Sequence, residues 1–292
     1  MNRMYSNRVY IAIFLLPALV LFCGVLIAPI GASGYFSLYD WNGLAGKTFI
    51  GFDNYKELFT SDSIGFMKAL GNSLLLAGLS VFLQLPLALA LALALGNRIK
   101  GERVFLSVFF MPVLISTVVI GQLWLKIYNP DYGILNVALR AVGLDNLAQI
   151  WLGNVSTALP AVFVPILWQY VGYHMLLLYA GVKSVPTELR EAAMLDGATN
   201  GQVNRYIVLP YIKPIIKISV IFAVTGSLKS FDLIYVLTNG GPLHSTEVPS
   251  TLMISMLFLR NRYGMGSTIA VLLILLCFAF ALLINFVFRE ED

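Results

Sequence analysis

Long apolar runs alternate with shorter polar stretches along the whole chain. A helix that crosses a bilayer needs about 20 largely apolar residues, and several runs in this sequence approach that length. Hydropathy therefore predicts an all-α integral membrane protein with about six transmembrane helices, forming a single domain over residues 1–292. The expected spans lie near residues 9–30, 72–95, 104–125, 158–182, 214–237 and 265–288.

Two segments need separate interpretation. The first run is too long for a signal peptide and lacks a small-residue cleavage site, so we expect it to remain as an uncleaved span. Pro17 and Pro29 are compatible with this, because neighbouring helices can satisfy the freed carbonyl groups. The apolar segment from Thr251 to Leu259 is too short to span, and we expect it to lie along the surface or to pack on the bundle.

The basic residues predict the orientation of these spans. Short cytoplasmic loops carry an excess of Lys and Arg. Such residues precede the first span and are concentrated in the second-to-third and fourth-to-fifth loops: Arg3, Arg8, Arg98, Lys100, Arg103, Lys183, Arg190, Arg205 and Lys213. We therefore expect both termini and these loops to face the cytoplasm.

Composition and motifs argue against a soluble protein, a nucleic-acid-binding protein and an enzyme. Hydrophobic residues make up 59% of the chain and charged residues only 12%, about half the usual share for a soluble domain. The net charge of +4 is spread thinly, without a basic run, so a nucleic-acid partner is not expected. Gly46-Lys47-Thr48 resembles the end of a phosphate-binding loop, but Trp41 stands where that loop requires glycine. No metal-ligand spacing, catalytic nucleophile or carboxylate pair is evident, so we expect no enzyme activity, metal or bound cofactor.

The fourth-to-fifth loop, residues 184–213, predicts a helix, a bend and a second short helix before the chain returns to the membrane. Pro186 suits a first helical turn, and Glu188 lies near the positive end of that helix. Asp196 followed by Gly197 predicts its end, since glycine adopts a left-handed cap without strain. An ordinary connector that caps the bundle is the alternative to a docking surface for another protein.

This loop is similar to the EAA loop of binding-protein-dependent ABC importer permeases, in which it forms the coupling helix that docks on the ATPase. The resemblance rests on Glu191-Ala192-Ala193, Asp196-Gly197-Ala198, Ile207, Leu209-Pro210 and Pro214. The sequence departs from the family at Gly201 and Asn204, where aromatic residues are common. The resemblance assigns ATPase coupling to Glu188, Glu191, Ala192, Ala193, Asp196, Gly197, Ala198, Leu209 and Pro210.

Three further segments resemble carbohydrate-uptake permeases of the maltose type, and within them the first of two permease subunits. They are Phe49-Ile50-Gly51-Phe52-Asp53-Asn54-Tyr55, Gly133-Ile134-Leu135-Asn136, and Phe231-Asp232 through Leu237-Thr238-Asn239-Gly240-Gly241-Pro242. The resemblance implies a type I importer fold in a bacterial or archaeal cytoplasmic membrane. It also implies three partners, namely a second permease, an ATPase dimer that binds ATP and Mg, and an extracytoplasmic sugar-binding protein.

Polar residues cluster within the fourth and fifth spans. Placing a polar side chain inside the bilayer costs free energy, so such residues usually face a cavity or another subunit. Aromatic faces with nearby amide and hydroxyl groups suit a sugar, and the same stretches hold substrate in related permeases. We therefore expect the substrate path to include Trp168, Gln169, Tyr170, Tyr173, Gly226, Ser227, Lys229, Ser230 and Asp232. Lys229 and Asp232 have an alternative role, pairing with each other across one helical turn. For His174 we favour a helix contact over a proton relay.

Two other functions remain as alternatives. A secondary transporter driven by ions would favour buried carboxylates and repeated halves with interrupted helices, but the spans hold one plausible carboxylate, Asp232, and no convincing repeat. The second alternative function is that of an ABC importer for glycerol phosphates or another polar solute. Anionic cargo favours several cations, and Lys229 is the one candidate that we find in the path.

Overall fold

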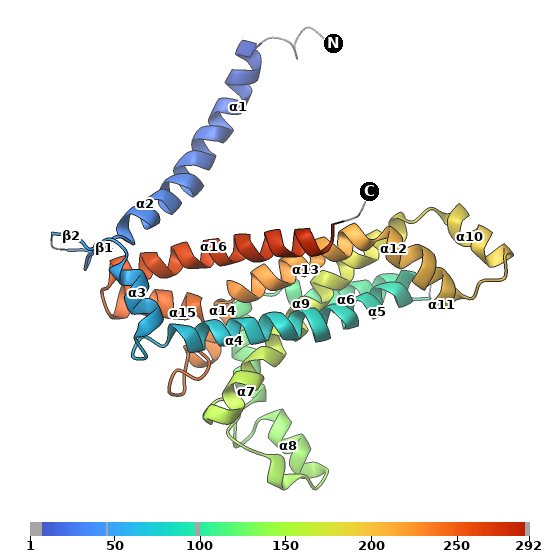
Figure 1. Ribbon diagram of the computed structural model, residues 1–292. Helices are drawn as coiled ribbons and strands as arrows, with labels where there is room; N and C mark the ends of the chain where they lie inside the picture. Colours follow the sequence, from blue (N-terminus) through green and yellow to red (C-terminus); the bar gives the residue numbers. More distant parts are fainter. Residues whose placement is uncertain (1–7, 45, 97–99, 290–292) are drawn as a thin grey trace. The chain divides into compact units, whose positions relative to one another are not determined.

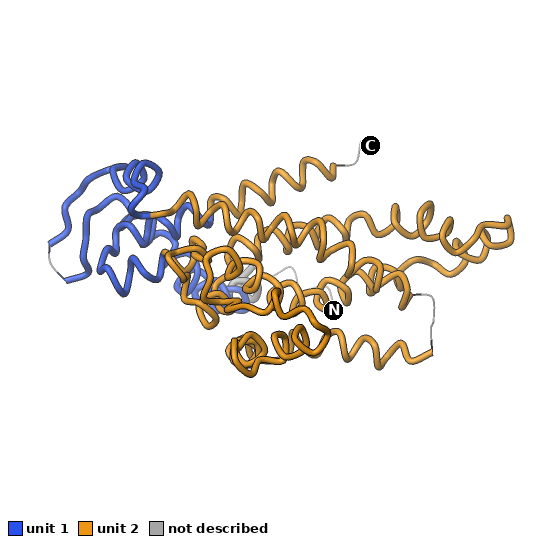
Figure 2. The backbone as a smooth tube through the Cα atoms, turned by 90° about the horizontal axis from the view of Figure 1, so that it is seen from below, with its two compact units in different colours: residues 1–64, 253–274 blue, residues 65–252, 275–292 orange. Residues whose placement is uncertain are grey.

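The computed structural model describes residues 8–44, 46–96 and 100–289, and it is nearly all helical. Arg3 and Arg98, which entered the orientation argument, lie outside the described residues. The chain divides into two compact units (Figure 2). Unit 1 comprises Met1–Ile64 and Met253–Ile274, and unit 2 comprises Gly65–Leu252 and Leu275–Asp292.

Five described helices are long and apolar enough to cross a membrane, and a bent pair makes a sixth if it counts as one span. They lie at Ile13–Phe36, Phe66–Gly96, Val155–Ser184, Lys213–Thr238 and Tyr263–Val287. The bent pair consists of α6 (Glu102–Leu114) and α7 (Thr117–Ile127), which meet at 96°. The expectation of about six spans in an all-α membrane protein is confirmed.

Proline explains three irregular turns in these helices. A proline cannot donate to the carbonyl four residues earlier and clashes with it, and a local π-helical turn can absorb the missing bond. Single π turns, at Cys23–Ile27, Ser80–Gln84 and Asn204–Val208, each end two residues before a proline, namely Pro29, Pro86 and Pro210. The chain therefore continues through these prolines as helix.

Unit 1 begins with α1 (Arg8–Phe22) and α2 (Ala28–Phe36), followed by the two-residue strands β1 (Tyr39–Asp40) and β2 (Thr48–Phe49). The strands pair antiparallel, with Tyr39 opposite Phe49. α3 (Asp53–Thr60) follows, and its Asn54 is 2% exposed. Asn54 Nδ2 donates to the carbonyls of Ser37, at 2.9 Å, and Tyr39, at 3.0 Å. Asn54, from a segment that prompted the family resemblance, thus fixes the local chain path.

Unit 2 is built around the long helix α9 (Val155–Ser184), which packs against α4 (Phe66–Leu79), α5 (Leu85–Gly96), α6 and α7 (Figure 1). Its other neighbours are α13 (Lys213–Leu228) and α14 (Asp232–Thr238). Phe163, Met175 and Leu178 form the buried face of α9. The remaining elements of the unit are α8 (Ile134–Ala141), a 3-10 turn at Asp145–Leu147, α10 (Thr187–Leu195), α11 (Asn200–Val203) and α12 (Leu209–Tyr211).

The last two helices continue across the unit boundary in sequence. α15 (Pro249–Ile254) and a π turn at Ser255–Leu259 form the short apolar segment noted above, and α16 (Tyr263–Val287) follows. Leu252 and Met256 of the short segment are fully buried, whereas Phe258 and Leu259 are exposed. Of the two expectations for this segment, burial favours a packed helix.

Candidate functional site

The loop between α9 and α13 has the predicted shape. α10 begins directly after Pro186 and ends in Asp196-Gly197, where Gly197 has a φ of 88°. The N–H of Ala198 donates to the carbonyl of Ala193 at 2.9 Å, and that of Gly197 to Met194 at 3.1 Å. This pair of bonds is the Schellman motif. Thr199 and Gln202 then form a capping box that starts α11. The prediction of a helix, a bend and a second short helix is confirmed.

The nine residues expected to couple to an ATPase fall into two groups. Ala193, Ala198 and Leu209 are half-buried and pack on a cluster that includes Val182, Val203 and Ile212. The others are exposed: Glu188, Glu191, Ala192, Asp196, Gly197 and Pro210. One side of the loop therefore holds it to the bundle, and the other is open to a partner. Within unit 2, α10 and α11 project beyond the ends of α5 and α6 (Figure 1).

Two features of α10 were missed by sequence reasoning. Arg190 Nη2 donates to the carbonyl of Val182, in the last turn of α9, so a cation caps the negative end of that helix. Leu189, Met194 and Leu195 are exposed apolar residues, and Leu195 is 89% exposed. Apolar residues on a projecting helix indicate a protein-binding surface. Met194 and Leu195 stand within the helix predicted for this loop, but the sequence alone did not predict that they are exposed.

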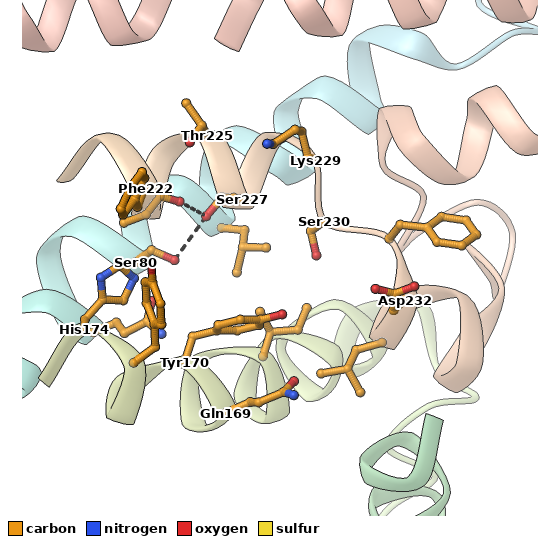
Figure 3. Close-up of a pocket in the computed structure, with 18 of the residues that line it drawn as sticks. Ser80, Gln169, Tyr170, His174, Phe222, Thr225, Ser227, Lys229, Ser230 and Asp232 are labelled. Carbon is orange, nitrogen blue, oxygen red and sulfur yellow. Dashed lines mark hydrogen bonds between the residues drawn. The ribbon is translucent and has the colours of Figure 1, made fainter. Parts of the chain in front are cut away.

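A cavity of about 320 Å³ lies between α4, α9, α13 and α14 within unit 2 (Figure 3). It brings together most of the residues expected in the substrate path, including groups that come from separate helices. Those that line it are Gln169, Tyr170, Tyr173, Gly226, Ser227, Lys229, Ser230 and Asp232. Trp168 is not among the lining residues; its ring meets Trp124 edge to face, with centroids 5.9 Å apart. Its side of α9 packs on α7 instead.

A break in the fifth span shapes the cavity. α13 ends at Leu228 and α14 starts at Asp232, so Lys229 and Asp232 do not share a helical turn. Ser230 lies between them in Figure 3, and the described residues include no ion pair between these two. The alternative of mutual pairing across one turn of helix is therefore wrong, because the helix is interrupted there.

Gln169 is the most informative lining residue. It is 2% exposed, and its Nε2 donates to the carbonyl of Pro112 at 3.4 Å. Its Oε1 has no hydrogen-bond partner among the described residues. Buried polar atoms are nearly always paired, so an unpaired acceptor in a cavity wall calls for a donor from a ligand or water.

Sequence reasoning missed two polar lining residues of the second span, Ser80 and Gln84, which are four residues apart. Ser80 Oγ lies 3.2 Å from Ser227 Oγ, and Gln84 Nε2 donates to the carbonyl of Leu167 at 3.0 Å. The rule that polar residues in a span face a cavity would have found both. His174 also lines the cavity, with its Nδ1 2.8 Å from Ser219 Oγ. That contact between α9 and α13 confirms the helix-contact interpretation of His174.

The described residues contain no group of three or more His, Cys, Asp or Glu side chains that could hold a metal ion. What the cavity offers is tyrosine rings, hydroxyls and amides, with Lys229 as the one cation and Asp232 as the one carboxylate among its described lining residues. Such a lining can bind a polar, uncharged molecule by stacking and hydrogen bonding.

Comparison with known proteins identifies the family. The model of the family "Binding-protein-dependent transport system inner membrane component" matches residues 84–290. The "Probable ABC transporter permease protein YurN" of Bacillus subtilis is 39% identical over 95% of both chains. The multiple sugar-binding transport system permease protein of Streptococcus mutans is 33% identical over 94% of this chain and 93% of its own.

Two further comparisons agree. The diacetylchitobiose uptake system permease protein of Streptomyces coelicolor is 32% identical over 98% of this chain and 84% of its own. A bacterial ABC transporter involved in the import of the acidic polysaccharide alginate has a chain of 25% identity with a TM-score of 0.84, covering 97% of this chain and 96% of that chain. The expected type I importer permease fold is thereby confirmed, and the chain belongs to the family of inner membrane components of binding-protein-dependent transport systems.

Proposed function

We propose that this chain is a transmembrane permease subunit of an ATP-driven importer for sugars, including oligosaccharides, and that the whole chain serves as one permease domain. Family membership and the names of its relatives support import with a binding protein. The observation that carries the sugar assignment is the Oε1 of Gln169, which is unpaired among the described residues, in a cavity whose described lining has no net charge. A sugar hydroxyl can donate to that oxygen while a tyrosine ring packs against the sugar face.

The charge of the cavity bears on the choice of cargo. Glycerol phosphates and other anions favour several converging cations. Lys229 is balanced here by Asp232, so neutral cargo is favoured.

The exposed side of α10 is proposed to dock on a separate ATPase subunit, which binds ATP and Mg. An apolar patch beside Glu191 and a rigid left-handed cap at Gly197 support a defined docking surface. A second, related permease completes the path and docks on the second ATPase. Closure of the ATPase pair then moves α10, and α9 follows because Arg190 ties the two helices together. The cavity thereby switches between inward and outward access.

The loop between α9 and α13 then faces the cytoplasm, together with both termini. An extracytoplasmic sugar-binding protein delivers cargo to the opposite side. The membrane is the cytoplasmic membrane of a bacterium or archaeon.

The test is purification of the tagged protein from its native membrane in mild detergent, followed by identification of co-purifying subunits and reconstitution into vesicles. We expect an ATPase and a second permease, with sugar uptake that needs both ATP and the binding protein. Gln169→Leu, which removes the unpaired acceptor, should lower uptake while the complex still forms. A protein that purifies alone and transports without ATP would identify a secondary transporter instead.

A further inference from the structure

A second pocket lies at the loop end of unit 2, separate from the sugar cavity. Its volume is about 620 Å³, and it forms where the first turn of α13 meets the last turns of α16. Its lining combines basic and apolar side chains: Lys213, Pro214, Lys217, Leu282, Phe286 and Arg289. None of these residues belongs to the proposed substrate path or to the docking surface of α10.

Three basic side chains line this pocket. Lys213 and Lys217 are four residues apart and therefore lie on one face of α13, and Arg289 lies two residues beyond the end of α16. Lys217 Nζ donates to Asn285 Oδ1 at 3.1 Å, which holds its ammonium group at the pocket. The described lining contains no carboxylate. The N-terminus of α13 and the C-terminus of α16 contribute opposite partial charges of about half a unit that largely cancel, so the helix ends add little to the charge of the described lining.

The other wall is apolar and open. Leu282 and Phe286 are 53% and 71% exposed and lie four residues apart on α16. Phe288 packs against a buried cluster that includes Val224 and Leu228. Only 11% of the most apolar stretch of α16 is buried within the chain. The apolar wall of the pocket therefore continues along the helix into an exposed surface that suits acyl chains. Cations at the end of a span beside an exposed apolar wall match an amphiphilic anion, with its head at the cations and its tail along the helix.

We propose that this pocket binds the headgroup of an anionic phospholipid, with its phosphodiester held by Lys217, Lys213 and Arg289 and its acyl chains along Leu282 and Phe286. A soluble phosphate could contact the same cations but would leave the apolar wall unused. The lipid site depends on the membrane location that family membership establishes, and not on which cargo is carried.

The experiment compares lipid binding by the purified complex and its variants. The complex is stripped of bound lipid, titrated with phosphatidylglycerol or phosphatidylcholine, and analysed by native mass spectrometry. Each cation near an anionic lipid contributes about fivefold in affinity, so Lys217→Gln with Arg289→Gln should weaken phosphatidylglycerol binding about 25-fold. The matched control is Lys100→Gln with Arg103→Gln, which removes the same charge at the same end of the bundle. It should bind as the unmodified complex does, and Lys217→Arg should retain binding.

The proposal would be overturned by equal binding of both lipids, by equal loss in the control pair, or by full displacement of phosphatidylglycerol by excess inorganic phosphate. The last would identify a soluble anion as the ligand. Glu290, Glu291 and Asp292 follow Arg289 in the sequence. Their amide variants retain every lining cation and should bind the lipid at least as tightly, so a loss of binding in these variants would also refute the site. Melting temperatures of each variant distinguish lost binding from lost folding.

Discussion

The guanidinium group of Arg262 donates two hydrogen bonds to the carboxylate of Glu57, at 2.7 and 2.5 Å, across 205 residues of sequence. Both residues belong to unit 1, where this bidentate pair joins α3 to the chain just before α16. The same contact lowers the pKa of Glu57, an effect opposed by its partial burial, and raises the pKa of Arg262. Of the two ion pairs between described residues of unit 1, this is the one that joins segments distant in sequence.

Stability of unit 1 should therefore depend on pH. Because the pKa of Glu57 is lowered by folding, its carboxylate contributes its full stability at pH values above 4.5, the ordinary pKa of the group. This contribution is lost as the pH falls through the lower pKa of the folded state. Glu57→Gln should reduce the free energy of unfolding by about 1 kcal/mol or less at neutral pH, because the pair is partly exposed. Thermal unfolding in detergent at neutral and acidic pH measures this.

In acid, the difference between Glu57→Gln and the unmodified protein should shrink. The control is Lys56→Gln, which breaks the exposed pair of Lys56 with Asp53 and should have a smaller effect. A loss of stability in Glu57→Gln that is the same at both pH values would contradict an electrostatic role.

Gly197 should be sensitive to substitution, because its φ of 88° is strained for any other residue. Gly197→Ala should destabilise the loop by about 1 kcal/mol and lower uptake. Gly197→Pro should abolish uptake, since it also removes the N–H that donates to Met194. The matched control is Gly201→Ala, where an added methyl meets nothing within 4 Å. Uptake and membrane insertion are measured together, and normal uptake by Gly197→Pro would refute a rigid cap.

Glu191→Lys should prevent ATPase docking while membrane insertion remains intact. Glu191 is exposed on α10, so its change does not disturb packing. Co-purification of the ATPase with the variant is the measurement, and Arg205→Gln, on the exposed part of the following turn, serves as a comparison. An intact complex with normal uptake would show that Glu191 lies outside the docking surface.

Tyr170→Ala combined with Ser230→Leu should impair transport without loss of subunit assembly. Tyr170 offers a ring to the cavity, and an aromatic contact of this kind contributes about 1 kcal/mol, or roughly fivefold in rate at limiting cargo. Trp168→Phe is the control, because Trp168 lies beside Tyr170 in sequence but packs on Trp124. Sugar uptake into vesicles, normalised to assembled complex, measures the effect. Lost assembly would assign these residues to packing.

Gly172 should tolerate no larger side chain. An added methyl would overlap the backbone of Phe109, so α6 and α9 would have to move apart. Gly172→Ala should therefore destabilise the protein by about 1 to 3 kcal/mol. Gly78→Ala, which faces open space in α4, should leave the melting temperature unchanged. Equal melting temperatures for the two variants would refute close contact at Gly172.

Local chemistry explains what the sequence determined. The apolar runs predicted the spans because lipid forces each backbone polar group to pair within its own helix. The helix, bend and second helix near Gly197 were predictable because caps depend on residues within a few positions of each other. The polar residues of the fourth and fifth spans could be recognised as candidate site residues because burying a polar side chain in the bilayer costs free energy.

Only the tertiary structure decided which of those residues share a cavity. Ser80 and Ser227 meet across 147 residues, a contact that depends on how the second and fifth spans pack together and that no local rule contains. The break between Leu228 and Asp232 has no glycine or proline to signal it, so the separation of Lys229 from Asp232 was hidden in the sequence. The pocket between α13 and α16 could not be predicted from the sequence either, because its cations come from segments about 70 residues apart. These segments are brought together by the packing of many apolar side chains that are distant in sequence.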